Sequence, residues 1–317
     1  MRILFLFFDG VGLGEDDPAN NPFAAADLPT LSSLTAGQRW LNGLPRIESE
    51  RASFIPTDVC LGVSGRPQSA TGQAAIMTGS NVPRRLGYHY GPKPNPEIIT
   101  IIKESGLVRR LTESGLRSGL LNAYPSTFIE NIERGKRLPS SNQMALREGG
   151  VRLLDGGDLL EKRAMSADFT GEMWWRHAAH HDAATKIWRT EFGNDSQPVM
   201  RPEEAGAHLA ALAGDYDFSF FDCWLTDYIG HRGGLDDAID ALRVIDGVMK
   251  GLLAAWDDDQ GLIIVTSDHG NIEDLSERSH TRNPVPSLVI GSARHQITSG
   301  LEDLTGFAEG IVDMLTA

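Results

Sequence analysis

The stretch MRILFLFFDG at residues 1–10 decides the fold of this chain. Ile3 to Phe8 form a continuous apolar run, which is typical of a strand that is buried on both faces of a parallel sheet. Asp9 follows directly after the run, and ligands of open α/β sheets collect at the carboxyl ends of the strands. We therefore expect a buried strand over residues 3–8, with a functional carboxylate just past its end.

Two later apolar runs end in the same way. The segment DFSFFDCWLT at residues 217–226 leads into Asp227, and GLIIVTS at residues 261–267 leads into Asp268. Both runs have the length and apolar content of buried strands. We therefore predict that three strand ends present three carboxylates.

Helical segments separate these strands. Residues 235–256 carry apolar side chains at a period of about 3.6 residues, which predicts a helix that covers the sheet. We expect one or two helices over residues 96–115, a strand within residues 116–124, and a closing helix over residues 306–316. Strands that alternate with helices predict an α/β fold with a doubly wound, mostly parallel sheet.

One stretch does not follow this pattern. Residues 125–198 contain charged runs such as IERGKR, paired glycines and no clear buried strand. We interpret this stretch as an inserted smaller cap that packs over the strand ends. The core domain is then formed by residues 1–124 together with residues 199–317.

Composition and charge narrow the class of protein. The chain has 317 residues, 41% of them hydrophobic and 23% charged, as is usual for a folded globular protein. Its net charge of −14 comes from acidic residues that are spread along the chain, and such a surface repels nucleic acid. The first apolar run is too short for a membrane span or a signal segment. Cys60 and Cys223 lack CxxC spacing, so we expect free thiols and a cytoplasmic location.

A set of Asp, His and Ser residues could bind metal ions. Four oxygen ligands and three imidazoles suit a pair of divalent cations and metal-assisted phosphoryl transfer. The candidate ligands are Asp9, Ser69, Asp227, His231, Asp268, His269 and His280.

The two Asp–His pairs depend on local turns. We expect Gly230 and the RGG that follows to form a tight turn, which brings Asp227 and His231 to one cation. Asp268 and His269 are adjacent and would point to opposite faces of a strand. A turn at Gly270 allows them to bind one ion together or one ion each.

Ser69 lies in RPQSATGQAAIMTG, a polar turn followed by a helix of small residues. At a helix N-terminus its oxygen would feel the positive end of the dipole and the backbone N–H groups that bind phosphate. An ordinary N-cap serine is the alternative, and Thr71 competes for the role of nucleophile. His280 lies in SHTRNPVP, where Arg282 is close enough in sequence to reach the same site.

Other histidines have simpler explanations. His177, His180 and His181 have a spacing that allows one helical face to hold a metal, but a packing or solvated helix of the cap is the favoured interpretation. His89, His208 and His295 have no recognisable partner pattern.

These motifs resemble those of the alkaline phosphatase superfamily, and within it the metalloenzyme domain of cofactor-independent phosphoglycerate mutase and phosphopentomutase. The resemblance covers about the first 80 residues and residues 217–291. It implies an alkaline phosphatase-like fold with a two-metal site and a nucleophilic serine. Ser69 is preferred over Thr71 because QSATGQ aligns with the mutase pattern NSEVGH, and Gln73 replaces a histidine that is not expected to be a ligand.

The resemblance also implies how the ligands divide. Asp9, Ser69, Asp268 and His269 would bind one ion. Asp227, His231 and His280 would bind the other. Both manganese and zinc accept such mixed ligands.

The mutases carry a much larger insert with an arginine-rich substrate site. In this chain Arg134, Lys136 and Arg137 could hold a second anionic group, with Arg282 as a further candidate, although a solvated basic turn is the favoured interpretation of the first three.

These features together predict a two-metal phosphoryl-transfer enzyme, either a phosphomutase or a phosphatase, that acts on a small phosphorylated metabolite through a phosphoserine. A phosphodiesterase or phosphonate hydrolase of the same superfamily is one alternative. A catalytically silent metal-binding protein is another. A sulfatase is disfavoured, because Ser69 lacks the sequence context that formylglycine formation needs.

Overall fold

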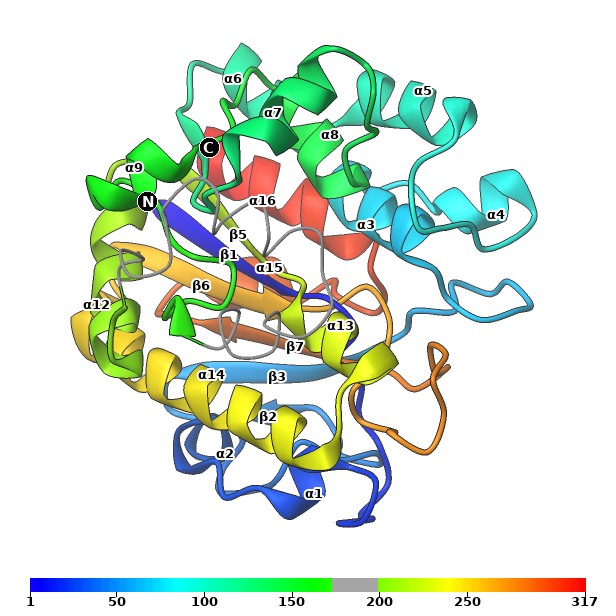
Figure 1. Cartoon of the computed structure of the whole chain (residues 1–317), viewed down its shortest axis with the longest axis vertical. Helices are drawn as coiled ribbons and strands as arrows, with labels where there is room; N and C mark the ends of the chain where they lie inside the picture. Colours follow the sequence, from blue (N-terminus) through cyan, green and yellow to red (C-terminus); the bar gives the residue numbers. More distant parts are fainter. Residues whose placement is uncertain (173–198) are drawn as a thin grey trace.

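A central β-sheet with helices on both faces organises the chain (Figure 1). The structure is a computed structural model, and it describes residues 1–172 and 199–317. The sheet contains seven strands. They are β1 (Arg2–Phe8), β2 (Ile47–Glu48), β3 (Ala52–Thr57), β4 (Ser118–Leu120), β5 (Phe218–Cys223), β6 (Gly261–Thr266) and β7 (Val285–Ile290).

The strand order is β2-β3-β7-β6-β1-β5-β4. Strand β1 runs parallel to both of its neighbours, β5 and β6, and β4 is parallel to β5. Strand β7 is antiparallel to β6 and β3, and β2 is antiparallel to β3. The predicted α/β fold with a mostly parallel sheet is therefore confirmed, with antiparallel pairing confined to one side of the sheet.

Strand β1 is buried on both of its faces. Its even-numbered side chains, from Leu4 to Phe8, pack into one hydrophobic core, and its odd-numbered ones, from Ile3 to Phe7, pack into the other. Successive side chains of a strand point to opposite faces, so a strand between two cores must be apolar throughout. This confirms the interpretation of residues 3–8.

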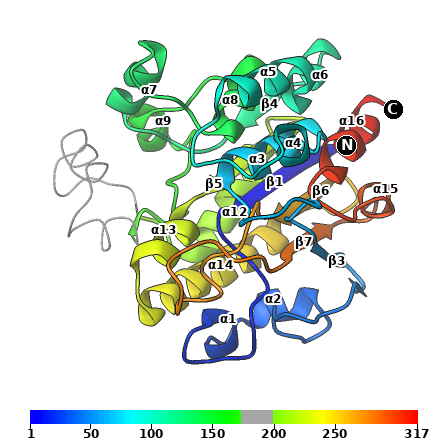
Figure 2. The ribbon, with the colours of Figure 1, turned by 90° about the vertical axis from the view of Figure 1, so that its right-hand side faces the viewer.

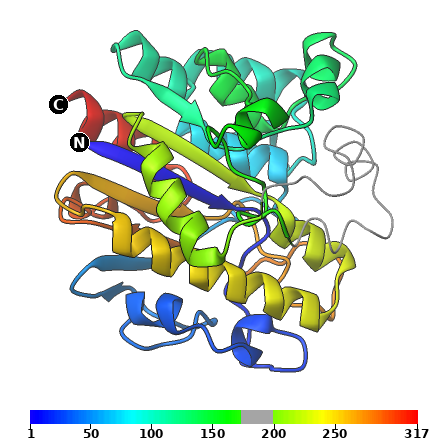
Figure 3. The ribbon, with the colours of Figure 1, turned by 60° about the vertical axis from the view of Figure 1, so that its left-hand side comes forward.

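Two layers of helices cover the sheet (Figures 1 and 3). The helices on the face of the odd-numbered β1 side chains include α3 (Ser69–Thr78), α5 (Pro96–Ser105), α6 (Leu107–Glu113), α8 (Ser141–Glu148) and α16 (Gly306–Thr316). The helices on the other face include α1 (Pro22–Ala25), α2 (Pro29–Leu34), α12 (Pro202–Ala213) and α14 (Leu235–Ala255). The other described helices are α4 (Val82–Leu86), α7 (Ser126–Glu133), α9 (Gly156–Leu160), α13 (Leu225–Arg232) and α15 (His295–Thr298).

The predicted helices are confirmed. Helix α14 begins at Leu235 and ends one residue before Trp256, and residues 96–115 form α5 and α6, ahead of β4. The two chain ends lie close together at one edge of the molecule (Figure 2). Over residues 1–172 and 199–317, no helix combines the length and apolar character that crossing a membrane requires.

The predicted cap lies partly outside the described residues. Its described part contains α7, α8 and α9. Helix α8 packs against α3, α5 and α6, and the Ser141 hydroxyl donates a hydrogen bond of 2.8 Å to the carbonyl of Ala70. The division of the chain into a core and an inserted cap stays a prediction.

Candidate metal centre

The parallel strands β1, β5 and β6 end at nearly the same level of the sheet. Phe8 lies opposite Cys223, and Phe7 lies opposite Thr266. Because of this register, Asp9 and Asp268 emerge at one edge, as we expected. Gly10 turns the chain there with a φ of +71°, and an added Cβ would lie 2.8 Å from Asp227 Oδ1. The loop after β1 therefore lies directly against Asp227.

Ser69 is the first residue of α3 and is only 8% exposed. Its Oγ lies 3.0 Å from His269 Nε2. The competing Thr71 points elsewhere, because its hydroxyl donates to the carbonyl of Gln68 at 3.0 Å and accepts from the N–H of Tyr90 at 3.2 Å. The geometry therefore favours Ser69 over Thr71 as the nucleophile.

The expected turn at Gly230 is wrong. Strand β5 ends at Cys223, and Asp227 and His231 lie on helix α13, which continues to Arg232. A helix forms here because Leu225 and Ile229, four positions apart, both pack into the core. Asp227 and His231 share another face of α13, with 3.4 Å between Oδ2 and Nε2. A helical spacing of four residues thus brings this pair together.

Asp268 and His269 lie in the loop after β6 and are fully buried. His269 Nε2 is 3.4 Å from Asp9 Oδ1 and 3.6 Å from Asp268 Oδ2. Neither carboxylate oxygen of Asp268 has a hydrogen-bond donor among the described residues, and the same is true of Asp9 Oδ1. Buried carboxylate oxygens without donors are costly, so a cation is the natural partner for them.

His231 and His280 are oriented by backbone carbonyls. His231 Nδ1 lies 2.8 Å from the carbonyl of Arg278, and His280 Nδ1 lies 2.9 Å from that of Pro67. Each ring therefore donates from Nδ1 and, when neutral, has a lone pair on Nε2. The Nε2 atoms of His231 and His280 are 3.2 Å apart. Asp227 Oδ1 lies 3.7 Å from His280 Nε2. This is a donor set that fits a divalent cation.

The structure brings all seven predicted ligands to one edge of the sheet. Potential ligand atoms fall into two groups, each with atoms within 4.8 Å of one another: Asp227, His231 and His280 in one, and Asp9, Asp227 and His269 in the other. The first group is the one that we predicted. The second group differs from the predicted set in containing Asp227, whereas Ser69 Oγ and Asp268 Oδ2 lie beside it, 3.0 and 3.6 Å from His269 Nε2.

The pKa shifts of the clustered aspartates and of His269 also indicate that this site requires a bound cation. Burial raises the pKa values of Asp9 and Asp268, and neighbouring carboxylates raise them further. Burial lowers the pKa of His269 to about 3, with a smaller effect from His280. A divalent cation reverses this situation, because it favours ionised carboxylates and neutral imidazoles.

Two residues that position the ligands were not predicted. Asn271 Nδ2 donates to Asp227 Oδ1 at 2.7 Å. The buried carboxylate of Glu273 accepts from the N–H groups of Gly12 and Asn271, at 3.0 and 2.7 Å, and from the hydroxyl of Thr281. Glu273 therefore ties together the loops that carry Asp9, His269 and His280. Asn271 was visible within the DHGN segment, whereas the contacts of Glu273 with Gly12 join residues that are far apart in sequence.

The candidate substrate residues have different surroundings. Arg134 forms an exposed ion pair with Glu130 at 3.3 Å. Lys136 and Arg282 are exposed, and Arg137 lies over the Phe128 ring at 4.6 Å. The roles of these four residues stay predictions.

Several further predictions concern histidines and cysteines. His177, His180 and His181 lie outside the described residues. Within residues 1–172 and 199–317, His89, His208 and His295 join neither ligand group. Cys60 and Cys223 are free thiols, as predicted.

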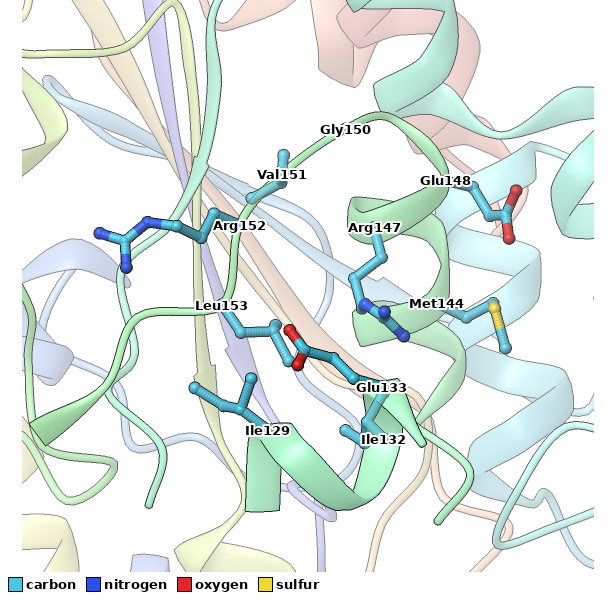
Figure 4. A pocket seen from close by; sticks show the side chains of 10 residues that line it. All are labelled: Ile129, Ile132, Glu133, Met144, Arg147, Glu148, Gly150, Val151, Arg152 and Leu153. Atoms are coloured by element: carbon cyan, nitrogen blue, oxygen red, sulfur yellow. The ribbon is translucent and has the colours of Figure 1, made fainter. Parts of the chain in front are cut away.

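A cavity of about 410 Å³ lies between α7 and α8 (Figure 4). Apolar side chains such as Ile129, Ile132 and Leu153 line it together with charged ones such as Arg147. The predicted metal ligands do not line this cavity, so it is separate from the metal centre.

Part of the chain is similar in sequence to known metalloenzymes. Residues 192–309 match the model of the Metalloenzyme superfamily. The 2,3-bisphosphoglycerate-independent phosphoglycerate mutase of Rhodopseudomonas palustris is 34% identical over 119 residues, which are 35% of this chain and 24% of the relative. The same enzyme of Legionella pneumophila is 29% identical over 110 residues, 32% of this chain and 21% of the relative. The chain thus matches less than a quarter of the length of these relatives.

Solved structures share the fold over almost the whole chain. A protein of Pyrococcus horikoshii matches with a TM-score of 0.57 and 13% identity, covering 99% of this chain and 96% of its own. Alkaline phosphatase from the Antarctic bacterium TAB5 matches with a TM-score of 0.51 and 13% identity, covering 99% and 98%. The predicted resemblance to alkaline phosphatase-like metalloenzymes is confirmed.

Proposed function

We propose that this protein is a metal-dependent phosphoryl-transfer enzyme that forms a phosphoserine at Ser69. Its substrate would be a small phosphorylated metabolite. The observation that carries the proposal is the position of Ser69 Oγ, 3.0 Å from His269 Nε2 and at the N-terminus of α3, within the cluster of metal ligands. The net charge of −14 disfavours a nucleic-acid substrate.

Seven side chains would hold two divalent cations, Mn²⁺ or Zn²⁺. Asp9, Ser69, Asp268 and His269 would bind one, and Asp227, His231 and His280 the other. Bound cations of this kind lower the pKa of a coordinated hydroxyl and neutralise phosphoryl oxygens.

The chemistry then takes place at Ser69. Its Oγ attacks phosphorus, the phosphoester P–O bond breaks, and the alcohol leaves with a proton. The positive end of the α3 dipole favours the negative charge that gathers beside Ser69. In a second step, water or a substrate hydroxyl attacks phosphorus and releases Ser69. Attack by water makes the protein a phosphatase, and attack by a hydroxyl makes it a mutase.

Two alternatives use the same site. A phosphodiesterase or phosphonate hydrolase would need only a different substrate pocket. A catalytically silent metal-binding protein would keep the ligands and lose the chemistry. The presence of Ser69 beside a complete ligand set favours an enzyme. Free Cys60 and Cys223 agree with a cytoplasmic location, which we retain as a proposal.

A substrate panel tests this proposal. Wild-type protein reconstituted with Mn²⁺ or Zn²⁺ should turn over a phosphomonoester, with phosphosugars and phosphoglycerates also tested in a mutase-coupled assay. Ser69→Ala should lose at least about 1,000-fold of that activity, because the nucleophile is gone. Unchanged turnover by Ser69→Ala would exclude the covalent mechanism. Two bound ions with no turnover of monoesters, diesters, phosphonates or sulfates would support the silent protein.

A further inference from the structure

A loop with a half-buried lysine packs against the N-terminus of α3. The carbonyl of Tyr90 accepts the N–H of Thr71 at 3.1 Å. A Cβ added to Gly91 would lie 3.1 Å from Gln68 Cβ and 3.3 Å from the backbone nitrogen of Ser69. Lys93 follows two residues later, a separation that spans at most about 7 Å of chain. Its side chain therefore starts beside the proposed nucleophile.

Lys93 is half-buried and forms no ion pair with a carboxylate in the part of the chain that the structure describes. Burial and the positive charge of Arg137 lower the pKa of Lys93, while the carboxylates of Asp222 and Asp9 oppose this effect. Lys93 therefore lies within electrostatic reach of a metal ligand, of a second buried carboxylate and of another cation.

Arg137 lies in the loop after α7, and its positive charge acts on Lys93. Its guanidinium lies over the Phe128 ring at 4.6 Å, and that ring stacks on Tyr124 with centroids 5.1 Å apart. Tyr124 follows β4, which is the neighbour of β5 in the sheet. The stacked rings of Phe128 and Tyr124 thus hold the guanidinium of Arg137 near the edge of the sheet. Arg137 has no carboxylate partner within the described ranges and remains exposed.

The charge of Asp222 acts both on Lys93 and on the metal ligands Asp9 and Asp268. Asp222 belongs to β5, is 4% exposed, and its Oδ1 has no hydrogen-bond donor among the described residues. Its backbone is held by Asn122, which accepts from the N–H of Asp222 at 2.7 Å and donates to its carbonyl at 2.8 Å. Asp222 adds a further negative charge that acts on both Asp9 and Asp268.

A phosphorylated substrate brings further negative charge to this edge of the sheet. The carboxylates of Asp9, Asp222, Asp227 and Asp268 carry four negative charges, which two divalent cations would neutralise. A phosphate dianion adds two more negative charges in a poorly solvated site, where uncompensated charge is costly. Lys93 and Arg137 supply two positive charges that have no carboxylate partner of their own.

We propose that Lys93 and Arg137 form an anion-binding subsite beside Ser69, which binds the anionic oxygens of the phosphoryl group that Ser69 accepts. This inference rests on the proposed function and adds to it the residues that bind the transferred group. The ammonium of Lys93 and the guanidinium of Arg137 both donate charge-assisted hydrogen bonds to phosphate oxygens.

Inorganic phosphate is the probe that tests the subsite. Its affinity for the full-length, metal-loaded protein is measured by calorimetry, together with the metal content of each variant. Lys93→Met and Arg137→Gln should each weaken phosphate binding about 10- to 100-fold, as expected when a hydrogen bond to a charged group is lost. Lys93→Arg should recover part of the affinity. Arg85→Gln is the control, since it removes an exposed cation from neighbouring helix α4 and should leave binding unchanged.

The outcomes separate this inference from the proposed function. Wild-type phosphate affinity in both Lys93→Met and Arg137→Gln, at full metal content, would overturn the subsite alone. Absence of phosphate binding by the wild-type protein would overturn the proposed function and the subsite together. If Lys93→Met does not fold, the phosphate affinities of Lys93→Arg and Arg137→Gln test the subsite instead. Ser69→Ala should still bind phosphate, although it cannot turn over a substrate.

Discussion

His231 and His280 point their Nε2 atoms at each other across 3.2 Å. Both rings are held by backbone carbonyls on their Nδ1 side, so each ring, when neutral, has a lone pair on Nε2. The lone pairs would repel each other unless a positive charge lies beside both. This relationship, together with the carboxylate of Asp227, indicates a metal ion more directly than any single motif does.

The first prediction concerns this histidine pair. His280→Ala should bind one metal ion fewer per chain and lose at least about 100-fold of the phosphoester turnover, because it removes an imidazole that we propose binds the metal directly. Metal content after dialysis and steady-state kinetics measure both effects. His295→Gln is the control, because His295 is exposed and joins neither ligand group. Full metal content in His280→Ala would contradict the assignment of His280.

Asn271 should matter for the metal although it is not a ligand. Its amide orients Asp227 through a 2.7 Å hydrogen bond. Asn271→Leu should weaken metal binding by about 10- to 100-fold, as is usual when a partner of a ligand is lost. Titration with a metal-competing dye gives the affinity. An unchanged affinity would mean that helix α13 alone fixes the position of Asp227.

Glu273 should stabilise the folded protein. Its buried carboxylate accepts hydrogen bonds from Gly12, Asn271 and Thr281. Glu273→Gln replaces one acceptor oxygen by an N–H₂ group, and the lost bonds should lower the free energy of unfolding by about 1–3 kcal/mol. Denaturant unfolding of the metal-free protein measures this. The exposed Glu277→Gln serves as a control and should change the free energy by less than about 1 kcal/mol.

Metal binding should weaken as the pH falls. The pKa values of Asp9 and Asp268 are raised, mainly by burial, so their protonated forms persist above the ordinary aspartate pKa of 3.8. A metal ion must displace these protons, and binding should therefore release protons and lose affinity between pH 7 and pH 5. Calorimetry in buffers of different ionisation enthalpy counts the protons. An affinity that does not change over this range would contradict the raised pKa values.

The fold could be predicted largely from apolar runs. Residues 3–8 are apolar because β1 lies between two cores, and helix α14 shows its buried face as a 3.6-residue period. The division into core and cap could not be tested in the same way, because residues 173–198 lie outside the described part of the chain.

The positions of the candidate ligands were predicted correctly where these residues directly follow a strand, and less well where they lie on a helix. Asp9 and Asp268 follow β1 and β6 closely, as their sequence context indicates. Asp227 was placed after a strand although it lies on helix α13, because the apolar segment continues past the true end of β5.

Positioning residues were missed for a different reason. The contact of Glu273 with Gly12 and the approach of Gly91 to Ser69 exist only once distant segments have packed together. Such contacts leave no local pattern of residue types or spacing. Asp222 and Lys93 were missed for the same reason, since each looks ordinary in its own segment.

The central claim is that Ser69 carries the phosphoryl group, and trapping that group tests it most directly. Metal-loaded protein is mixed with a substrate from the phosphoester panel, quenched in acid, digested and analysed by mass spectrometry. The account predicts a phosphoryl group on the peptide that contains Ser69, and none on that peptide from Ser69→Ala. Rapid substrate turnover with that peptide unmodified at every quench time, or with the phosphoryl group on Thr71, would contradict it.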